Sequence, residues 1–318
     1  SGEGGLVWFK CRNQAQGHGL FDTERGTLNL LQTNDSAAAQ TSETDTLTAF
    51  NSNGYSLGVD GTTDKVNRSA YTYSSWTFRR SKKFFDVVKY TGTGSNQLVS
   101  HNLGSVPGFY VVKKVDSQAS WNGYHRSLGK TKRIYLGAWA AADDTGDTYW
   151  NDTAPTSTTF SLGPDDEVNN DGGTYVCYLF AHNDGDGNFG EGGNKDVIKC
   201  GSYTGNGSSD GPVINLGWEP QWILFKYAGG NVGWFMYDTM RGIVSGGDDP
   251  YLNPNTNSAE VTNVDAFEVT PTGFKIKHAS DFVNNNGGTI VYVAIRRPDG
   301  YVGKPPELGT DVFAMDTG

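Results

Sequence analysis

Apolar and aromatic residues occur along the chain in short runs, separated by polar turns that are rich in Gly, Asn and Asp. Such runs recur roughly every ten residues, and some alternate apolar with polar positions, as residues 46–57 do around an Asn-Gly turn. No segment keeps the 3.6-residue period of a long amphipathic helix. The pattern therefore predicts an all-β protein of antiparallel β-sandwich units, of the jelly-roll or lectin-like kind.

The strand pattern repeats along the chain with a constant spacing. Four pairs of landmark residues are each 113 positions apart (205 minus 92 for the first pair): Gly92 and Gly205, Gly104 and Gly217, Pro107 and Pro220, Lys113 and Lys226. A third copy is visible upstream in two sets of matching segments: residues 6–10, 109–113 and 222–226, and residues 21–26 and 237–242. Units of this length are domain-sized, so we predict tandem copies of one sandwich.

The repeat divides the chain into consecutive parts. We predict a first unit at residues 1–85, a second at 86–195, a third at 196–300 and an exit linker at 301–318. The first unit lacks the Tyr-Thr-Gly connector that opens the second. We therefore expect that the first unit is truncated and that the sequence begins inside a longer parent protein.

Composition and charge narrow the class of protein. The 318 residues include 43 Gly and 13% aromatic residues, a mix typical of sheets joined by many turns. The net charge of −10 argues against a nucleic-acid partner, which would require clustered Lys and Arg. No apolar run approaches the roughly 20 residues of a membrane span, so we expect a soluble protein without membrane insertion. Three cysteines cannot form a disulfide framework in a chain of this size.

One polar turn recurs and is the first candidate for a binding site. Asp22 with Arg25, and Asp238 with Arg241, place opposite charges three residues apart before a Gly. Such a pair could hold sugar hydroxyls beside an aromatic face. The alternative is a structural turn locked by its own ion pair, because structural pairs are common outside functional sites. The second unit has His125 at the position of the aspartate, so the pair is not required for the fold.

Aromatic residues beside these turns complete the candidate site. Trp121 and Trp234 precede the variable turn, and we expect them to be more exposed than the tryptophans that lead strands, which are Trp8, Trp76, Trp218 and Trp222. Tyr124 and Tyr237 lie within the same segments. The predicted sugar-binding residues are therefore these four aromatic residues together with the two Asp and Arg pairs.

A weaker signal concerns calcium. Asp184, Asp186 and Asn188 alternate like the first ligands of a calcium loop. The pattern lacks the Gly expected at the sixth position, and its twelfth position is Lys195 in place of the bidentate Glu. A flexible acidic linker is the alternative, and we predict no cofactor. The five histidines match no catalytic motif, and 35 acidic residues produce chance carboxylate pairs, so we expect a protein that is not an enzyme.

Several motifs together resemble a known family. They include Phe-Asp-Thr-Glu-Arg-Gly at 21–26, His-Asn-Leu-Gly-Ser-Val-Pro-Gly at 101–108 and Gly-Trp-Glu-Pro-Gln-Trp at 217–222. The combination is similar to a repeat domain of unknown function in tail-fibre-like virion structural proteins of marine bacteriophages, cyanophages especially. The resemblance covers residues 5–298 and carries no catalytic residues.

The resemblance implies a virion protein that is assembled in the bacterial host cytoplasm and then forms part of the particle. It implies other virion subunits as partners, with a homotrimer in the parent fibre. We combine it with the repeats into one expectation, a tail fibre or surface appendage that contacts host polysaccharide or lipopolysaccharide weakly at each copy and gains avidity. A spacer or decoration domain and an envelope-glycan depolymerase are the alternatives.

Overall fold

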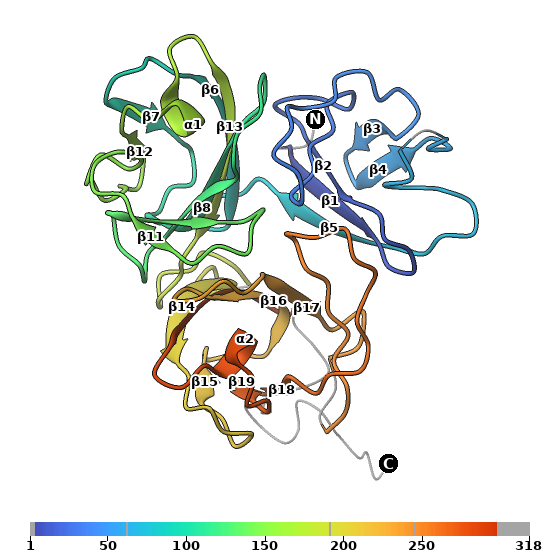
Figure 1. Ribbon diagram of the computed structural model, residues 1–318, viewed down its shortest axis with the longest axis vertical. Helices are drawn as coiled ribbons and strands as arrows, with labels where there is room; N and C mark the ends of the chain where they lie inside the picture. Colours follow the sequence, from blue (N-terminus) through green and yellow to red (C-terminus); the bar gives the residue numbers. More distant parts are fainter. Residues whose placement is uncertain (1–3, 62, 191, 244–245, 298–318) are drawn as a thin grey trace, which may run out of the picture.

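The computed structural model describes residues 4–61, 63–190, 192–243 and 246–297, so the predicted exit linker at 301–318 lies outside the described residues. The all-β prediction is confirmed. The described residues form 20 strands, whose ladders are all antiparallel, and two helices of four residues each. Three lobes surround a common centre (Figure 1).

The first lobe contains five strands. Its three-stranded sheet has the order β2-β1-β5, and a separate hairpin joins β3 to β4. The strands are β1 (Gly5–Cys11), β2 (His18–Asp22), β3 (Leu47–Asn51), β4 (Gly54–Leu57) and β5 (Tyr73–Arg79).

The second lobe has a six-stranded sheet of order β11-β10-β9-β8-β13-β6 and a two-stranded sheet of β12 and β7. Its elements are β6 (Phe85–Thr91), β7 (Gln97–Ser100), β8 (Pro107–Lys114), β9 (Asn122–His125), β10 (Lys132–Tyr135), β11 (Asp143–Asp144), β12 (Thr159–Leu162), α1 (Asp166–Asn169) and β13 (Thr174–Ala181). The side chain of Asp165 accepts the Glu167 amide and caps α1.

The third lobe pairs a four-stranded sheet, β14-β20-β16-β17, with a three-stranded sheet, β15-β19-β18. Its elements are β14 (Ile198–Thr204), β15 (Val213–Asn215), β16 (Pro220–Tyr227), β17 (Phe235–Asp238), β18 (Phe267–Thr270), β19 (Gly273–Ile276), α2 (Asp281–Asn284) and β20 (Thr289–Arg296). The order β14-β20-β16-β17 matches the order β6-β13-β8-β9 of the second lobe.

The ladders give the repeat a structural meaning. Pro107 begins β8 and pairs with Ala181 beside a register shift, while Pro220 begins β16 and pairs with Arg296 beside a similar shift. The two prolines therefore occupy equivalent positions, as their spacing predicts. Pro has no N–H to donate to a ladder, so within a sheet it is confined to places such as the first residue of a strand or a bulge.

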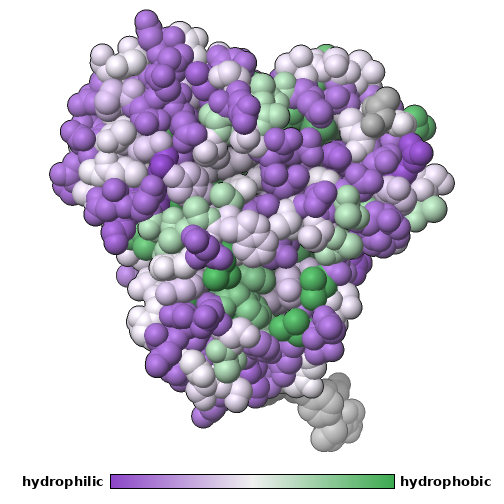
Figure 2. Space-filling view, viewed as in Figure 1, coloured by the Kyte–Doolittle hydropathy of each residue, from purple (hydrophilic) through white to green (hydrophobic). Residues whose placement is uncertain are grey.

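The three lobes share the largest of three hydrophobic clusters, while the third and first lobes each have a smaller cluster of their own. The largest buried cluster draws residues from every lobe, including the equivalent strand residues Leu6, Phe109 and Trp222. These three side chains also line an apolar cavity of about 20 Å³. An apolar space of that size, close to one water molecule, is expected to be dry. Figure 2 shows hydrophilic residues over most of this face, with hydrophobic patches mainly where the lobes adjoin.

Candidate functional site

The predicted ion-pair turn of the first unit lies at a contact with the second unit. The Nε of Arg25 donates to Oδ2 of Asp22 at 2.6 Å, and both side chains are buried. The hydroxyl of Tyr178, on β13, donates to the same Oδ2 at 2.8 Å and lies 3.1 Å from Nη2 of Arg25. The interpretation as a locked structural turn fits this geometry. We call each contact between two units a seam.

The third unit builds the same arrangement against the first. Nε of Arg241 donates to Oδ2 of Asp238 at 2.6 Å. Trp76, on β5, donates its Nε1–H to that oxygen at 3.0 Å, and its ring lies 5.4 Å from the guanidinium carbon of Arg241. Glu260 adds a second carboxylate at 3.0 Å from Nη1 of Arg241. The charges are therefore satisfied inside the seam.

The second unit contacts the third with different chemistry at the same place. Nε2 of His125 lies 3.1 Å from the carbonyl oxygen of Tyr292, on β20. Burial lowers the pKa of His125 to about 4, so the ring is neutral at pH 7. The ladder position of Tyr178 and Trp76 is occupied by Val293 in the third unit. An apolar partner explains why no ion pair is needed there.

Three equivalent lysines each form a hydrogen bond across one of the seams. Lys10, Lys113 and Lys226, which we call the ring lysines, are fully buried. Nζ of Lys113 donates to the Ser36 carbonyl at 3.0 Å, Nζ of Lys226 to the Trp139 carbonyl at 3.4 Å, and Nζ of Lys10 to the Asn257 carbonyl at 3.4 Å. Each bond joins one unit to another in cyclic order, so the three units form a closed ring.

The expected exposure of Trp121 and Trp234 is wrong, because both side chains are fully buried at the seams. Nε1 of Trp121 donates to the Gln32 carbonyl at 2.9 Å, and Nε1 of Trp234 donates to the Tyr135 carbonyl at 2.6 Å. A buried indole needs a partner for its N–H, and the neighbouring unit provides it.

The other aromatic candidates are also interior residues. Tyr124 is 5% exposed and Tyr237 is fully buried. Together with the two tryptophans and the two Asp and Arg pairs, they pack the core and the seams. None of the eight predicted sugar-binding residues offers a surface to a ligand: the two tyrosines are packed inside their own units, and the tryptophans and ion pairs are covered by a neighbouring unit.

The calcium candidates face cations. The carboxylate of Asp186 lies 3.6 Å from Nζ of Lys83, and that of Asp184 lies 3.9 Å from Nζ of Lys199. The described residues contain no group of three or more potential acidic, His or Cys ligands. Lysines beside the carboxylates compete with a bound cation, so the loop geometry does not favour calcium.

A polar cluster on the second unit was not predicted from the sequence. We call it the Arg133 cluster; its members are Asn122, Arg133, Tyr135, Asp143, Tyr149 and Glu167. Arg133 forms three hydrogen bonds to Asp143 across the β10–β11 pair: Nε donates to Oδ1 at 3.1 Å and to Oδ2 at 3.2 Å, and Nη2 donates to Oδ2 at 3.1 Å. Its Nη1 lies 3.3 Å from Oε2 of Glu167, which follows the start of α1.

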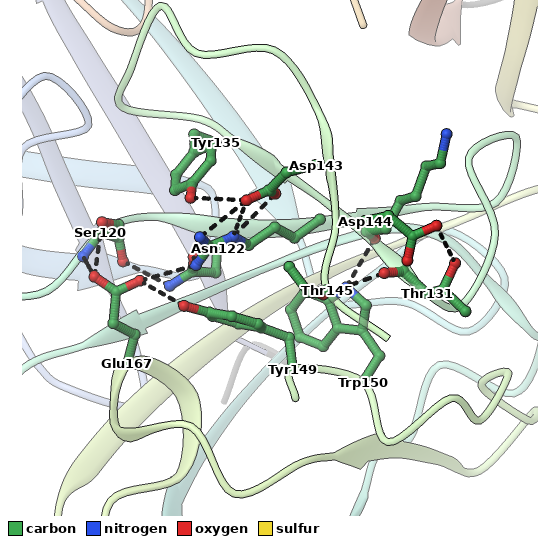
Figure 3. A network of polar contacts seen from close by, with 12 residues as sticks. Ser120, Asn122, Thr131, Tyr135, Asp143, Asp144, Thr145, Tyr149, Trp150 and Glu167 are labelled. Atoms are coloured by element: carbon green, nitrogen blue, oxygen red, sulfur yellow. Dashed lines mark hydrogen bonds and ion pairs between the residues drawn. The ribbon is translucent and has the colours of Figure 1, made fainter. Parts of the chain in front are cut away.

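Aromatic rings hold the same guanidinium. Its carbon lies 4.4 Å from the ring centre of Tyr135 and 4.0 Å from that of Tyr149. The hydroxyl of Tyr149 donates to Glu167, and that of Tyr135 donates to Asp143 (Figure 3). These cation–π contacts and charge-assisted bonds fix the geometry of both carboxylates.

The carboxylates remain partly open to solvent: the side chain of Asp143 is 43% exposed and that of Glu167 is 32% exposed. Burial raises the pKa of Glu167, but hydrogen bonds from Ser120 and the charge of Arg133 outweigh it and lower that pKa below its ordinary value. Glu167 can therefore accept hydrogen bonds from hydroxyl groups near neutral pH, while a proton-donating role for it is disfavoured.

The other units show that this cluster is not a requirement of the fold. Within the third unit, the positions of Asn122, Arg133 and Glu167 hold aromatic residues that contact one another: Phe235, Tyr251 and Phe282. The paired positions of Arg133 and Asp143 hold Leu30 and Gln40 in the first unit. The same backbone thus carries an apolar cluster elsewhere. A position-by-position alignment of the repeats would have revealed this difference from sequence.

The described residues include no helix long and apolar enough to cross a membrane. No curated protein is detectably similar to the chain. A solved structure titled "Crystal Structure of the STIV MCP" aligns with 67% of this chain and 95% of its own, at 8% identity and a TM-score of 0.20. That score is too low to support an argument about function. A family described as "Domain of unknown function (DUF7483)" matches residues 2–297. Because the match spans nearly the whole chain, the protein belongs to the DUF7483 family.

Proposed function

We propose that the chain is a structural protein of a bacteriophage virion, a tail fibre or surface appendage, and that its second unit contacts glycan on the host cell surface. The phage assignment rests on the motifs that resemble tail-fibre-like proteins. The glycan contact rests on one observation. The second unit alone has a charged and aromatic cluster at positions where the third unit has packed aromatic residues.

The chemistry of the Arg133 cluster suits sugar hydroxyls. Asp143 and Glu167 are held by Arg133, and part of each carboxylate faces solvent. Because the guanidinium and the two tyrosines fix them in advance, a ligand would lose little entropy in ordering them. Weak binding of this kind gains strength when a particle presents many copies.

Two alternatives predict different behaviour. A spacer or decoration domain would bind only other virion subunits. A depolymerase would cut its glycan, which requires an acid with a raised pKa, and the lowered pKa of Glu167 weighs against this. We propose a binding role without catalysis.

The test is retention of the chain on an array of bacterial polysaccharides and lipopolysaccharides. Asp143→Asn should weaken retention by about tenfold, a change equal to one lost charge-assisted bond of about 1.4 kcal/mol. The matched control is Asp171→Asn, an exposed carboxylate of the same unit outside the cluster. No retention of the unmodified chain would favour the spacer role, and release of reducing ends would favour the depolymerase.

A further inference from the structure

Trp139 differs from the other seven tryptophans of the chain. Its side chain is 50% exposed, whereas the others are buried or partly buried. It lies between β10 and β11, in residues 136–142, which reach across the seam to the third unit. Half of this large indole stays in water, so the free energy that its full burial would contribute is not gained.

The segment that carries Trp139 is held firmly. The Ala142 amide donates to the Ala228 carbonyl at 2.8 Å, and the Ala141 amide donates to Oδ1 of Asn231 at 3.2 Å. The ring lysine Lys226 donates to the carbonyl of Trp139 itself. These contacts all come from the third unit, so the seam fixes the backbone beneath the indole.

The indole itself lies against the main chain of the third unit. A side-chain carbon added at Gly233 would meet Cζ3 of Trp139 at 3.0 Å and Oδ1 of Asn255 at 2.8 Å. Glycine at this position therefore leaves space for the ring edge. The packing fixes one part of the indole, while the remainder is open to solvent.

The equivalent residues show that folding does not require an indole here. Ser36 and Asn257 occupy the same place at the other two seams, where Lys113 and Lys10 donate to their carbonyls. The backbone clamp is thus common to all three seams, and the side chain is free to vary. The large aromatic residue occurs at the seam of the unit that also carries the Arg133 cluster.

We propose that Trp139 and Asn231 form a carbohydrate subsite at the seam between the second and third units. The indole would stack on the apolar face of a neutral pyranose. Asn231 is exposed, and among the described residues its amide nitrogen has no hydrogen-bond partner, so it can donate to a ring hydroxyl. The inference rests on the proposed glycan contact and extends it: Tyr135 and Asp143 of the Arg133 cluster flank Trp139 in sequence, four residues away on either side.

The experiment measures the affinity of the whole chain for the array polysaccharide that retains it best. Trp139→Ala should weaken that affinity by about tenfold or more, and Trp139→Phe should lose less because a smaller ring still stacks. Met240→Ala is the matched control, since it removes another exposed apolar side chain, 93% exposed, from a turn of the third unit. The melting temperature of each variant checks folding, and Trp139→Phe decides the case if Trp139→Ala is unstable.

The outcomes separate the two proposals. Unchanged affinity of Trp139→Ala, alongside weakened binding by Asp143→Asn, overturns the seam subsite and leaves the proposed function intact. Absence of retention by the unmodified chain overturns both. Equal losses for Trp139→Ala and Met240→Ala would show a general effect of surface apolarity and would also overturn the subsite.

Discussion

Tyr178 provides a direct test of how the seams stabilise the protein. Its hydroxyl is buried and forms hydrogen bonds with both Asp22 and Arg25 across the seam between the first and second units. Tyr178→Phe removes this hydroxyl and keeps the ring. A hydrogen bond to a charged group contributes about 1.5–3 kcal/mol, and Arg25 keeps its direct bond to Asp22. We therefore expect the free energy of unfolding to fall by about 2–3 kcal/mol.

A second buried tyrosine of the same unit is the control. The hydroxyl of Tyr110 is buried and has no hydrogen-bond partner among the described residues, so Tyr110→Phe should be neutral or slightly stabilising. The assay is equilibrium unfolding in urea, followed by tryptophan fluorescence and circular dichroism. The two probes should report one transition, because the units share a core. A cost for Tyr178→Phe no larger than that for Tyr110→Phe would refute the reasoning.

Three further predictions concern Trp234, the ring lysines and the 184–188 loop. Trp234→Ala should lower the free energy of unfolding by about 3–5 kcal/mol, measured in urea, because it removes a fully buried indole. Burial lowers the pKa of the ring lysines from 10.5 to about 8, so above pH 8 the unfolded chain binds more protons and stability rises with pH. Between pH 8 and pH 9 the three lysines together should add about 3 kcal/mol to the free energy of unfolding, and Lys113→Met should remove about a third of this contribution. Ionisation of the buried thiols in the unfolded chain acts in the opposite direction and reduces the net gain. Excess EDTA should leave the melting temperature unchanged, because lysines face the carboxylates of the 184–188 loop; a drop restored by calcium would contradict this.

The local pattern of the sequence contained much of the fold. Alternating and continuous apolar runs identify strands such as β13 and β16, and the 113-residue spacing identifies equivalent positions such as Pro107 and Pro220. These signals are local or strictly periodic, so they do not depend on how the units pack together.

Ring closure could not be read in the same way. Hydrophobic patterning shows that a side chain is apolar, but it does not show which surface is covered by another part of the chain. The sequence therefore predicts exposure for Trp121 and Trp234, although the neighbouring unit buries them. Contacts such as Arg12 with Glu260 join residues 248 positions apart, for which the sequence gives no local signal.

The Arg133 cluster was missed for a different reason. The polar turn that stands out in the sequence is shared by the first and third units, and its residues hold the seams. The candidate site instead lies where the second unit departs from its copies, with Arg133 in place of Leu30 and Tyr251.

The seam between the third and first units decides whether the chain is a closed ring. The amide of Glu260 donates to the carbonyl of Arg12 at 2.8 Å, which brings the two backbones within the range of a disulfide. The three native cysteines are buried. In the double variant Arg12→Cys and Glu260→Cys, mild oxidation of the native chain should form this disulfide rapidly, detected by mass spectrometry of the linked peptides. A pair that stays reduced in the folded chain, while both thiols react with maleimide, would contradict the ring.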